Sequence, residues 1–515
     1  MMKKQRKWMV VCVILTMIMG MFVTYPMQMQ AKTIVKSIQL NLSEKTMCVG
    51  QKISLKVKKV TPSKASAAVT WSSSDENVAI VTQTGTVTAK NLGTAKIIAV
   101  SKNNKKVEEQ CTITVTETGD VRYSGKYQNV TWKIYQNGLL DIKGTGEAFG
   151  EANVSANKNV TNEEALSYTY NMPGWYKYAS VITRARVDIK DITNLNYAFD
   201  GLSLLKEVDL SKLDTSKVKS MYSMFYNCTS LKKIDVSNFD TSNVNNMANM
   251  FYNCRNLQIL DVGNFDTSKV VDMSGMFYNC MNLKSLDLSS FNTEKVKYMG
   301  SKEDELEDYS FLNYKAFRAS YTYGMFANCM KLKELNLSSF DTSNVSDMGY
   351  LFYGCKSLEK ADVSKFNTEK VTCMSGMFSG CKRLKEINLS SFDTTMVKRM
   401  TSMFYGCEKL KEIDVSSFDT ENVCSIKLMF AKCKSIETLD LSKLDFSSVE
   451  ENEGYFRNVG FVYKCTKLQT ILTPKKTNDS EFLLDGNKWV DSQGTEYNLL
   501  PSKAMQSITL TRKEG

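Results

Sequence analysis

One long period dominates the pattern of apolar positions along the chain. Cysteines recur at intervals of 26 residues, interrupted by one interval of 49 and one of 32. Repeats of this length are typical of solenoids, in which each unit covers only its neighbours and cannot bury a core alone. The register cysteines are Cys228, Cys254, Cys280, Cys329, Cys355, Cys381, Cys407, Cys433 and Cys465.

The apolar positions inside each unit predict its local structure. Aliphatic residues follow the cysteine at offsets of three, six and eight residues, as in Leu231, Ile234 and Val236. Alternation between offsets six and eight indicates a short strand, one rung per unit, which would form a parallel sheet on the concave face. The later stretch from Met247 to Cys254 is apolar at helical spacing, which predicts a short helix or tight turn on the convex side.

A separate pattern precedes the repeats, between residues 34 and 117. Short β-branched stretches alternate with turn-rich clusters, which predicts a small β-sandwich around Trp71. The run from Val69 through Trp71 to Asp75, with Gly85-Thr86-Val87, resembles the bacterial Ig-like group 2 domain. That resemblance implies a spacer or an adhesive module. Cys48 and Cys111 could form a disulfide or remain two buried thiols.

The first residues resemble an export signal. Four basic residues precede an apolar run from Trp8 to Val23, and Ala31 is a cleavage point for a signal peptide over residues 1–31. The formal net charge of +11 includes those four basic residues, so the mature chain would carry 11 − 4 = +7. This mild excess suits an acidic cell wall better than a nucleic-acid groove, and we expect no nucleic-acid partner and no membrane span after cleavage.

Histidine is absent from the chain. This excludes Ser-His-Asp and Cys-His catalysis and histidine metal sites, leaving carboxylate or lysine chemistry. We predict no enzyme activity, no catalytic residue, no cofactor and no metal site. The register cysteines lack close C-x-x-C pairs, so they are interpreted as a buried structural ladder. Cys373 and Cys424 fall outside that register.

The repeat units resemble one bacterial family. Met250-Phe251-Tyr252-Asn253-Cys254 and the stretch from Leu283 to Thr293 are similar to BspA-like leucine-rich-repeat surface proteins. The resemblance implies surface display and adhesion to host or microbial proteins. It also implies a β-rich cap at residues 120–189, a repeat array at 190–472 with about ten units and insertions at 300–323 and 450–461, and a C-terminal cap at 473–515. The fold class is therefore mainly β with short helices, an Ig-like sandwich followed by a leucine-rich-repeat solenoid.

A polar row is the first candidate binding surface. The residue seven positions after each cysteine lies between two buried positions of the strand and should face outward. Leu202 occupies the cysteine position one period before Cys228, and the residue seven positions after Cys465 is Leu472. We name the polar residues at this offset the acidic ladder: Asp209, Asp235, Asp261, Asp287, Asn336, Asp362, Asn388, Asp414 and Asp440. It could be a solvated network with Ser at offset nine and Lys at offset four, a contact face for a basic partner, or a calcium site.

The insertion between Met299 and Met325 is the second candidate. An acidic run, residues 302–308, precedes the aromatic residues Tyr309, Phe311, Tyr314 and Phe317. Aromatic side chains beside charge are typical of binding hot spots, although a folded-over hydrophobic patch explains them equally well.

These observations favour a secreted or surface-displayed protein that binds macromolecules. Its expected partners are extracellular proteins of a host or of other bacteria, with the cell wall as a further partner. The alternatives are a structural wall spacer and a carboxylate-dependent wall hydrolase, for which no carboxylate pair stands out.

Overall fold

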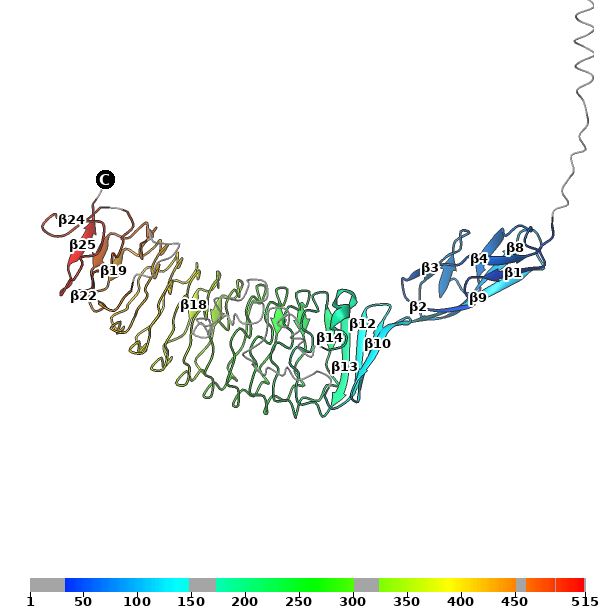
Figure 1. The fold of residues 1–515 in the computed structure, drawn as a ribbon, viewed down its shortest axis with the longest axis horizontal. Helices are drawn as coiled ribbons and strands as arrows, with labels where there is room; N and C mark the ends of the chain where they lie inside the picture. Colours follow the sequence, from blue (N-terminus) through cyan, green and yellow to red (C-terminus); the bar gives the residue numbers. More distant parts are fainter. Residues whose placement is uncertain (1–32, 148–172, 301–323, 451–459, 487, 514–515) are drawn as a thin grey trace, which may run out of the picture. The chain divides into compact units, whose positions relative to one another are not determined.

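The computed structural model describes residues 33–147, 173–300, 324–450, 460–486 and 488–513 (Figure 1). The chain divides into two compact units, residues 1–120 and 121–515. The expected signal peptide lies outside the described residues. The fold is mainly β, as expected, and η2 is the only helix among the elements of the described ranges.

The first unit consists of three small sheets around one apolar core. Its strands are β1 (Ser37–Leu40), β2 (Glu44–Cys48), β3 (Lys52–Ser54), β4 (Val57–Thr61), β5 (Val69–Ser73), β6 (Ala79–Val81), β7 (Thr86–Ala89), β8 (Gly93–Ser101) and β9 (Glu108–Thr116). They pair in the orders β1-β4, β2-β9-β8-β5 and β3-β7-β6. Trp71 is buried in the core, as expected. Cys48 and Cys111 are free buried thiols, and burial raises the pKa of Cys111 to about 11.

The second unit begins with a five-stranded sheet. It contains β10 (Val121–Tyr127), β11 (Val130–Tyr135), β12 (Leu139–Thr145), β13 (Arg184–Lys190) and β14 (Glu207–Asp209), and the 3-10 helix η2 (Tyr176–Val181) precedes β13. The first three strands are antiparallel, whereas β12, β13 and β14 are parallel. Trp132 and Trp175 lie in the same apolar cluster as the repeats, so this sheet closes one end of the shared core.

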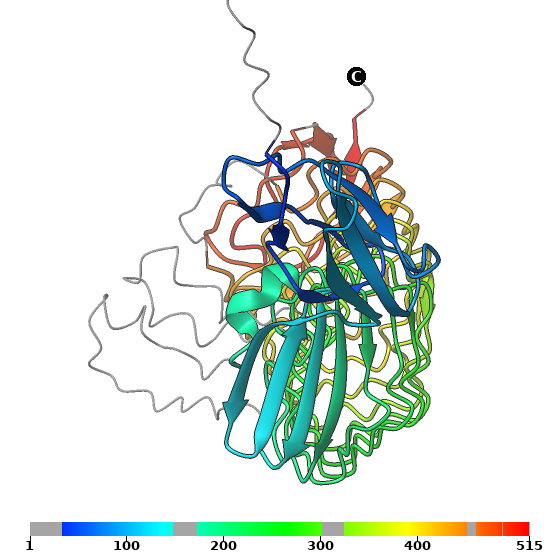
Figure 2. The same cartoon turned by 90° about the vertical axis from the view of Figure 1, so that its right-hand side faces the viewer.

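Successive 26-residue turns of chain then stack on one another in sequence order (Figures 1 and 2). We call the stretch from the first bridging residue to the register cysteine, such as residues 246–254, the return limb. Single parallel bridges join each return limb to the next, and backbone bonds such as Phe225 N–H to Met250 O (2.8 Å) reinforce them. The bridging residues are Asn194, Ser220, Asn246, Asp272, Tyr298, Asp347, Cys373, Arg399 and Ser425.

The expected parallel sheet, with one rung per turn on a concave face, is not confirmed. Pairing at the expected strand is limited to β15 (Lys233–Ile234) with β16 (Ile259–Leu260), β17 (Glu334–Leu335) with β18 (Lys360–Ala361), and β19 (Thr438–Asp440) with β21 (Thr470–Leu472), besides β13 with β14. The side chain of Asp235 accepts a bond from the backbone N–H of Ser237 (3.0 Å). This turn bends the chain directly after the strand and keeps the strand short.

Of the two structures expected for the return limb, a short helix or a tight turn, the described limbs form the tight turn. Asn227 and Asn253, directly before their cysteines, have φ values of 59° and 60°, in the left-handed region that a helix cannot contain. Ser223 has a φ of 53° in the same limb. The apolar spacing of Met, Met, Phe and Cys is therefore met by consecutive tight turns, in which Met224 N–H bonds to Met221 O and Cys228 N–H to Phe225 O.

The far end of the stack is closed by a second small sheet. Strands β23 (Trp489–Val490), β24 (Glu496–Tyr497) and β25 (Thr509–Arg512) continue from β21 in the order β19-β21-β25-β23-β24. A separate parallel pair joins β20 (Asp445–Phe446) to β22 (Lys476–Thr477). Arg512 lies over the ring of Trp489 and bonds to the carbonyl oxygens of Thr466 and Cys465.

The interior of the stack consists of aligned side chains. Phenylalanines of the return limbs stack almost parallel, with centroids 5.1 to 6.0 Å apart, from Phe199 to Phe430. Buried threonines link the turns by hydrogen bonds. The hydroxyl of Thr267 donates to the carbonyl of Asn292 (2.7 Å) and accepts from its N–H (2.8 Å). One side chain thereby satisfies two backbone groups of the next turn.

We predict that Thr267→Val destabilises the array. Valine keeps the shape of threonine but leaves the N–H and carbonyl of Asn292 unpaired, which should cost about 1–3 kcal/mol. Urea unfolding measures the effect. Thr438→Val, at an exposed strand position, is the control and should leave the midpoint unchanged. Equal midpoints for wild type and Thr267→Val would contradict the role assigned to this hydroxyl.

Candidate functional site

The nine register cysteines lie in the interior of the stack. Each is at most 1% exposed, and each thiol donates to a phenylalanine carbonyl of the preceding turn, as Cys254 Sγ does to Phe225 O (3.2 Å). Burial raises the pKa of Cys254, Cys355 and Cys465 to about 12. These thiols are therefore packing groups and hydrogen-bond donors, with no thiolate available for nucleophilic chemistry.

Two cysteines of the repeat array lie outside the register: Cys373 begins a return limb, and Cys424 lies directly before the limb that begins at Ser425. Cys373 is buried in the line of bridging residues. Cys424 is half-buried, and its thiol donates to the carbonyl of Lys398 (3.2 Å). Within the described ranges, no cluster of three or more cysteine, aspartate or glutamate side chains is arranged to hold a metal ion.

All nine residues of the acidic ladder are exposed. Their side-chain Oδ1 atoms accept a bond from the backbone N–H two residues later, over 2.9 to 3.2 Å, which fixes the orientation of each side chain. At Asp209, Asp235 and Asp362 the serine hydroxyl donates as well, over 2.6 to 2.7 Å. Because Asn336 and Asn388 make the same turn, the turn needs an oxygen and not a charge.

These bonds also set the charge of the ladder. Hydroxyl donation from serine holds the pKa of Asp209, Asp235, Asp362 and Asp414 below the usual value. At Asp287 the backbone N–H of the serine is the main cause of the lowered pKa. The ladder aspartates make no ion pair with a lysine of the described chain. The expected neighbour Lys385 pairs instead with Glu359 (2.7 Å). The serine half of the expected network is therefore present, and each aspartate of the ladder is exposed.

An arginine closes the N-terminal end of the ladder. Arg186 in β13 lies directly opposite Asp209 in β14 and opposite Asp141 in β12. Its guanidinium donates two bonds to the Asp141 carboxylate, both 3.0 Å long. Although burial pushes the pKa of Asp141 upward, the bonds and charge of Arg186 hold it below its usual value. A forked contact between a guanidinium and a carboxylate therefore lies directly beside the first residue of the ladder.

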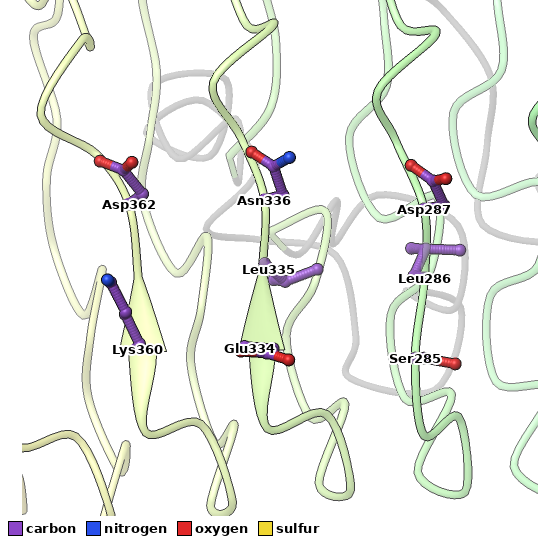
Figure 3. A pocket seen from close by; sticks show the side chains of 8 residues that line it. All are labelled: Ser285, Leu286, Asp287, Glu334, Leu335, Asn336, Lys360 and Asp362. Atoms are coloured by element: carbon purple, nitrogen blue, oxygen red, sulfur yellow. The ribbon is translucent and has the colours of Figure 1, made fainter.

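An open pocket of about 470 Å³ lies across three adjacent turns of the ladder (Figure 3). Asp287, Asn336 and Asp362 lie at the same level in neighbouring turns, with Ser285, Glu334 and Lys360 at a second level. The insertion begins after Gly300, yet the turns on its two sides remain adjacent, since Tyr298 bridges to Asp347. The ladder is continuous past the insertion.

The aromatic candidates of the insertion, Tyr309, Phe311, Tyr314 and Phe317, lie outside the described residues. Sequence reasoning also missed two features. Arg186 was overlooked because it precedes the first full repeat. A second aspartate row was also not singled out, although its members Asp214, Asp240 and Asp266 are exposed like the ladder.

Comparisons with known families cover most of the chain. Five overlapping matches to the family described as "Mycoplasma protein of unknown function, DUF285" cover residues 171–260, 233–313, 252–360, 320–438 and 385–470. Residues 34–115 match the bacterial Ig-like domain (group 2), which confirms the resemblance found in the first unit.

Individual relatives match only short stretches. A lacto-N-biosidase of Bifidobacterium bifidum is 48% identical over 63 residues, 12% of this chain and 6% of that protein. An uncharacterized protein of Clostridium acetobutylicum is 40% identical over 81 residues, 16% of this chain and 8% of that protein. The chain therefore spans less than a tenth of either relative.

Two solved structures superpose loosely on the chain. A leucine-rich repeat protein from Bacteroides ovatus is 14% identical with a TM-score of 0.27, covering 68% of this chain and 89% of that one. A leucine-rich cell surface protein from Faecalibacterium prausnitzii is 17% identical with a TM-score of 0.29, covering 68% and 95%. In the described part of the protein, no helix is long and apolar enough to cross a bilayer.

We predict that Ser237→Ala raises the pKa of Asp235 toward its ordinary value of 3.8, because it removes the hydroxyl that lowers it most. Carboxyl titration by NMR measures this. Ser289→Ala is the matched control, with a smaller effect on Asp287, whose lowered pKa depends first on the backbone N–H. A lowered carboxylate pKa stabilises the fold above the unfolded value, and that contribution is lost as the pH falls through the folded value. Ser237→Ala should therefore reduce the dependence of stability on pH below about 4.

We further predict that thiol alkylation of the folded protein modifies Cys424 and spares the nine register cysteines. Burial keeps the latter protonated and inaccessible, whereas Cys424 is half-buried at the surface. Peptide mapping by mass spectrometry, before and after denaturation in urea, distinguishes the two groups. Rapid modification of Cys254 in the native protein would contradict the packing described above.

Proposed function

The chain belongs to the DUF285 family of repeat proteins, and from this premise we propose that it is a secreted or surface-displayed leucine-rich-repeat solenoid that binds extracellular proteins through the acidic ladder. The observation that carries the proposal is the row of exposed side chains, each held by a hydrogen bond to its own turn. Fixed acceptors lose little conformational entropy when a partner binds.

The chemistry of the row favours a basic partner. Its lowered pKa values keep the carboxylates charged in any neutral or mildly acidic medium. The contact between Arg186 and Asp141 is an internal example of the pairing that a partner's arginine would make. Complementary charge of this kind steers association and adds specificity.

The ladder has a matched control surface in the same protein. The triple variant Asp235→Asn, Asp261→Asn, Asp287→Asn removes three charges and keeps the turns, because asparagine makes the same turn at Asn336 and Asn388. The control variant Asp214→Asn, Asp240→Asn, Asp266→Asn removes three charges from the second row, where Asp240 makes an equivalent turn with Ser242 (3.0 Å).

We predict that the ladder variant weakens binding to a panel of immobilised extracellular-matrix proteins by about tenfold or more at low ionic strength, and that the control variant does not. Surface plasmon resonance at two salt concentrations measures both. Equal losses for the two variants would show that only net charge matters, and would remove the ladder from the proposal. Deletion of residues 301–322 tests the aromatic insertion as an additional contact.

Two other functions remain as outcomes of the same experiment. A wall spacer would bind none of the matrix proteins, either as wild type or as the ladder variant. A wall hydrolase would release reducing sugars from purified wall polysaccharide. Neither function has a described feature in its favour comparable to the ladder.

A further inference from the structure

A strongly basic strip runs along the stack, separate from the acidic ladder. It consists of the residues one, two and four positions after each register cysteine, and after Leu202, which holds the cysteine position in the first turn. These residues directly precede the strand positions at offset five, such as Ser285, Glu334 and Lys360 in Figure 3. We call them the basic strip. Its positively charged members are all exposed: Lys206, Lys232, Arg255, Lys284, Lys331, Lys333, Lys356, Lys382, Arg383, Lys385, Lys409, Lys411, Lys434 and Lys467.

Positive charge is concentrated in this strip. Its thirty positions hold fourteen lysines and arginines and three acids, Glu359, Glu408 and Glu437, which gives 14 − 3 = +11. The whole chain has 66 basic and 55 acidic residues and the same net charge of +11. The remaining residues therefore balance, with 66 − 14 = 52 basic and 55 − 3 = 52 acidic side chains. A surface that accounts for the net charge of the chain is a candidate site for an anionic partner.

Hydrogen bonds hold the turns of the strip side by side. The N–H of Glu359 donates to the carbonyl of Lys333 (2.7 Å), and the side chain of Asn282 donates to the carbonyl of Arg255 (2.8 Å). Each of these bonds joins one turn to the next, so the backbones of neighbouring turns lie roughly 4.8 Å apart along the strip. The basic side chains therefore start from regularly spaced positions along the stack.

The three glutamates do not neutralise the strip. Glu408 forms ion pairs with Lys382 (3.0 Å) and Lys434 (2.8 Å), in the turns on its two sides. The hydrogen bonds from Lys434 and Lys382 hold the pKa of Glu408 below its ordinary value, so this carboxylate stays charged and serves two cations. Ten of the fourteen basic residues form no ion pair with a described residue: Lys206, Lys232, Arg255, Lys284, Lys331, Lys333, Lys356, Lys409, Lys411 and Lys467.

Like charges occupy equivalent positions of successive turns in the strip. Like charges on directly neighbouring strand positions repel and destabilise a fold. These side chains are exposed, so the packing of the core does not require them. An anion bound along the strip would relieve the repulsion. The pairs at one offset in successive turns are Lys356 with Lys382, Arg383 with Lys409, and Lys385 with Lys411.

We propose that the basic strip binds a flexible, linear polymer of the bacterial wall that carries a phosphodiester in each repeating unit. A strip that continues over ten turns matches a chain of anions, whereas a compact anion could contact only a few lysines. Lysine supplies twelve of the fourteen charges, and its compact ammonium group binds phosphate as a point charge. The choice of a wall polymer rests on the surface display in the proposed function. Binding of this kind would hold the protein at the cell surface.

The strip lacks the residues that nucleic acids use. Single strands stack their bases on aromatic side chains, and none of the thirty positions of the strip is aromatic. Specific contacts to guanine in a duplex are made most often by arginine, and the strip has only Arg255 and Arg383. A polymer of acyclic polyol phosphate has neither bases nor rings to stack. Its evenly charged backbone is therefore the better match for a strip of lysines.

The test uses the full chain and fluorescent poly(glycerol phosphate) in a long form and in a short form that spans only a few turns. Fluorescence anisotropy, at equal phosphate concentration, should show at least about tenfold tighter binding of the long form. The logarithm of the binding constant should fall linearly with the logarithm of the salt concentration. Equal affinity of the two forms would overturn the proposal.

A charge variant locates the site. The triple variant Lys331→Gln, Lys356→Gln, Lys409→Gln removes three exposed lysines that form no ion pair with a described residue, so it should fold like wild type. It should bind the long polymer about tenfold or more weakly, and three lost phosphate contacts should reduce the salt slope by about 2. Circular dichroism and the urea midpoint check the fold.

A second triple variant is the matched control. Lys219→Gln, Lys297→Gln and Lys398→Gln remove three exposed lysines that share another offset of the repeat, seventeen positions after the cysteine position. This control has the same net charge as the strip variant and should leave the affinity and the salt slope close to those of wild type. Equal losses in the two variants would show that only net charge matters, and would overturn the proposal.

The acidic-ladder triple variant separates this inference from the proposed function. It should bind the polymer at least as tightly as wild type, whereas the strip variant should keep its binding to matrix proteins. If the ladder variant also keeps its binding to matrix proteins, only the proposed function fails. Tighter binding of duplex DNA or of a sulfated glycan with the same number of charges would assign the strip to another class of polymer and overturn the proposal.

Discussion

The structure depends on hydrogen bonds that run from each turn of chain to the next. A 26-residue turn is too thin to enclose a core, so its backbone groups and apolar side chains are satisfied only by neighbouring turns. Main-chain bonds along the return limbs, buried threonine hydroxyls and cysteine thiols all point the same way, along the stack. The two terminal sheets are needed for the same reason, because the first and last turns would otherwise expose unpaired groups.

The sequence predicted the buried positions of the repeat better than the backbone conformation of its turns. Leu231 and its equivalents recur at one offset because every turn must fill the same position in the shared core. A core position that repeats in every turn appears in the sequence as a regular spacing of apolar residues. The backbone conformation of a turn is harder to infer from residue types than the positions of its buried side chains. Asn227 and Asn253 have positive φ values that exclude a helix, yet their type alone is equally compatible with a helix end or a surface loop. The sequence therefore left a short helix and a tight turn open for the return limb, and the structure shows the tight turn. The parallel sheet with one rung per turn is not confirmed, because strand pairing is sparse there.

The same difference separates the parts of the candidate surface that the sequence could reveal from the parts that needed the structure. The acidic ladder could be located from its alternation with buried positions, and its serine contacts followed from the known preference of aspartate for such turns. Arg186 could not be found, since it belongs to a strand outside the repeat that becomes a neighbour of Asp209 only in three dimensions.

The thiol ladder has a consequence for how such a protein can mature. Each register cysteine contributes through its size and its S–H donor, and all of those in the described chain are unpaired. The fold therefore requires neither an oxidant nor a disulfide isomerase. Assembly can proceed in a reducing medium, whereas in an oxidising one the thiols of each turn must be buried by the next turn before they form disulfides.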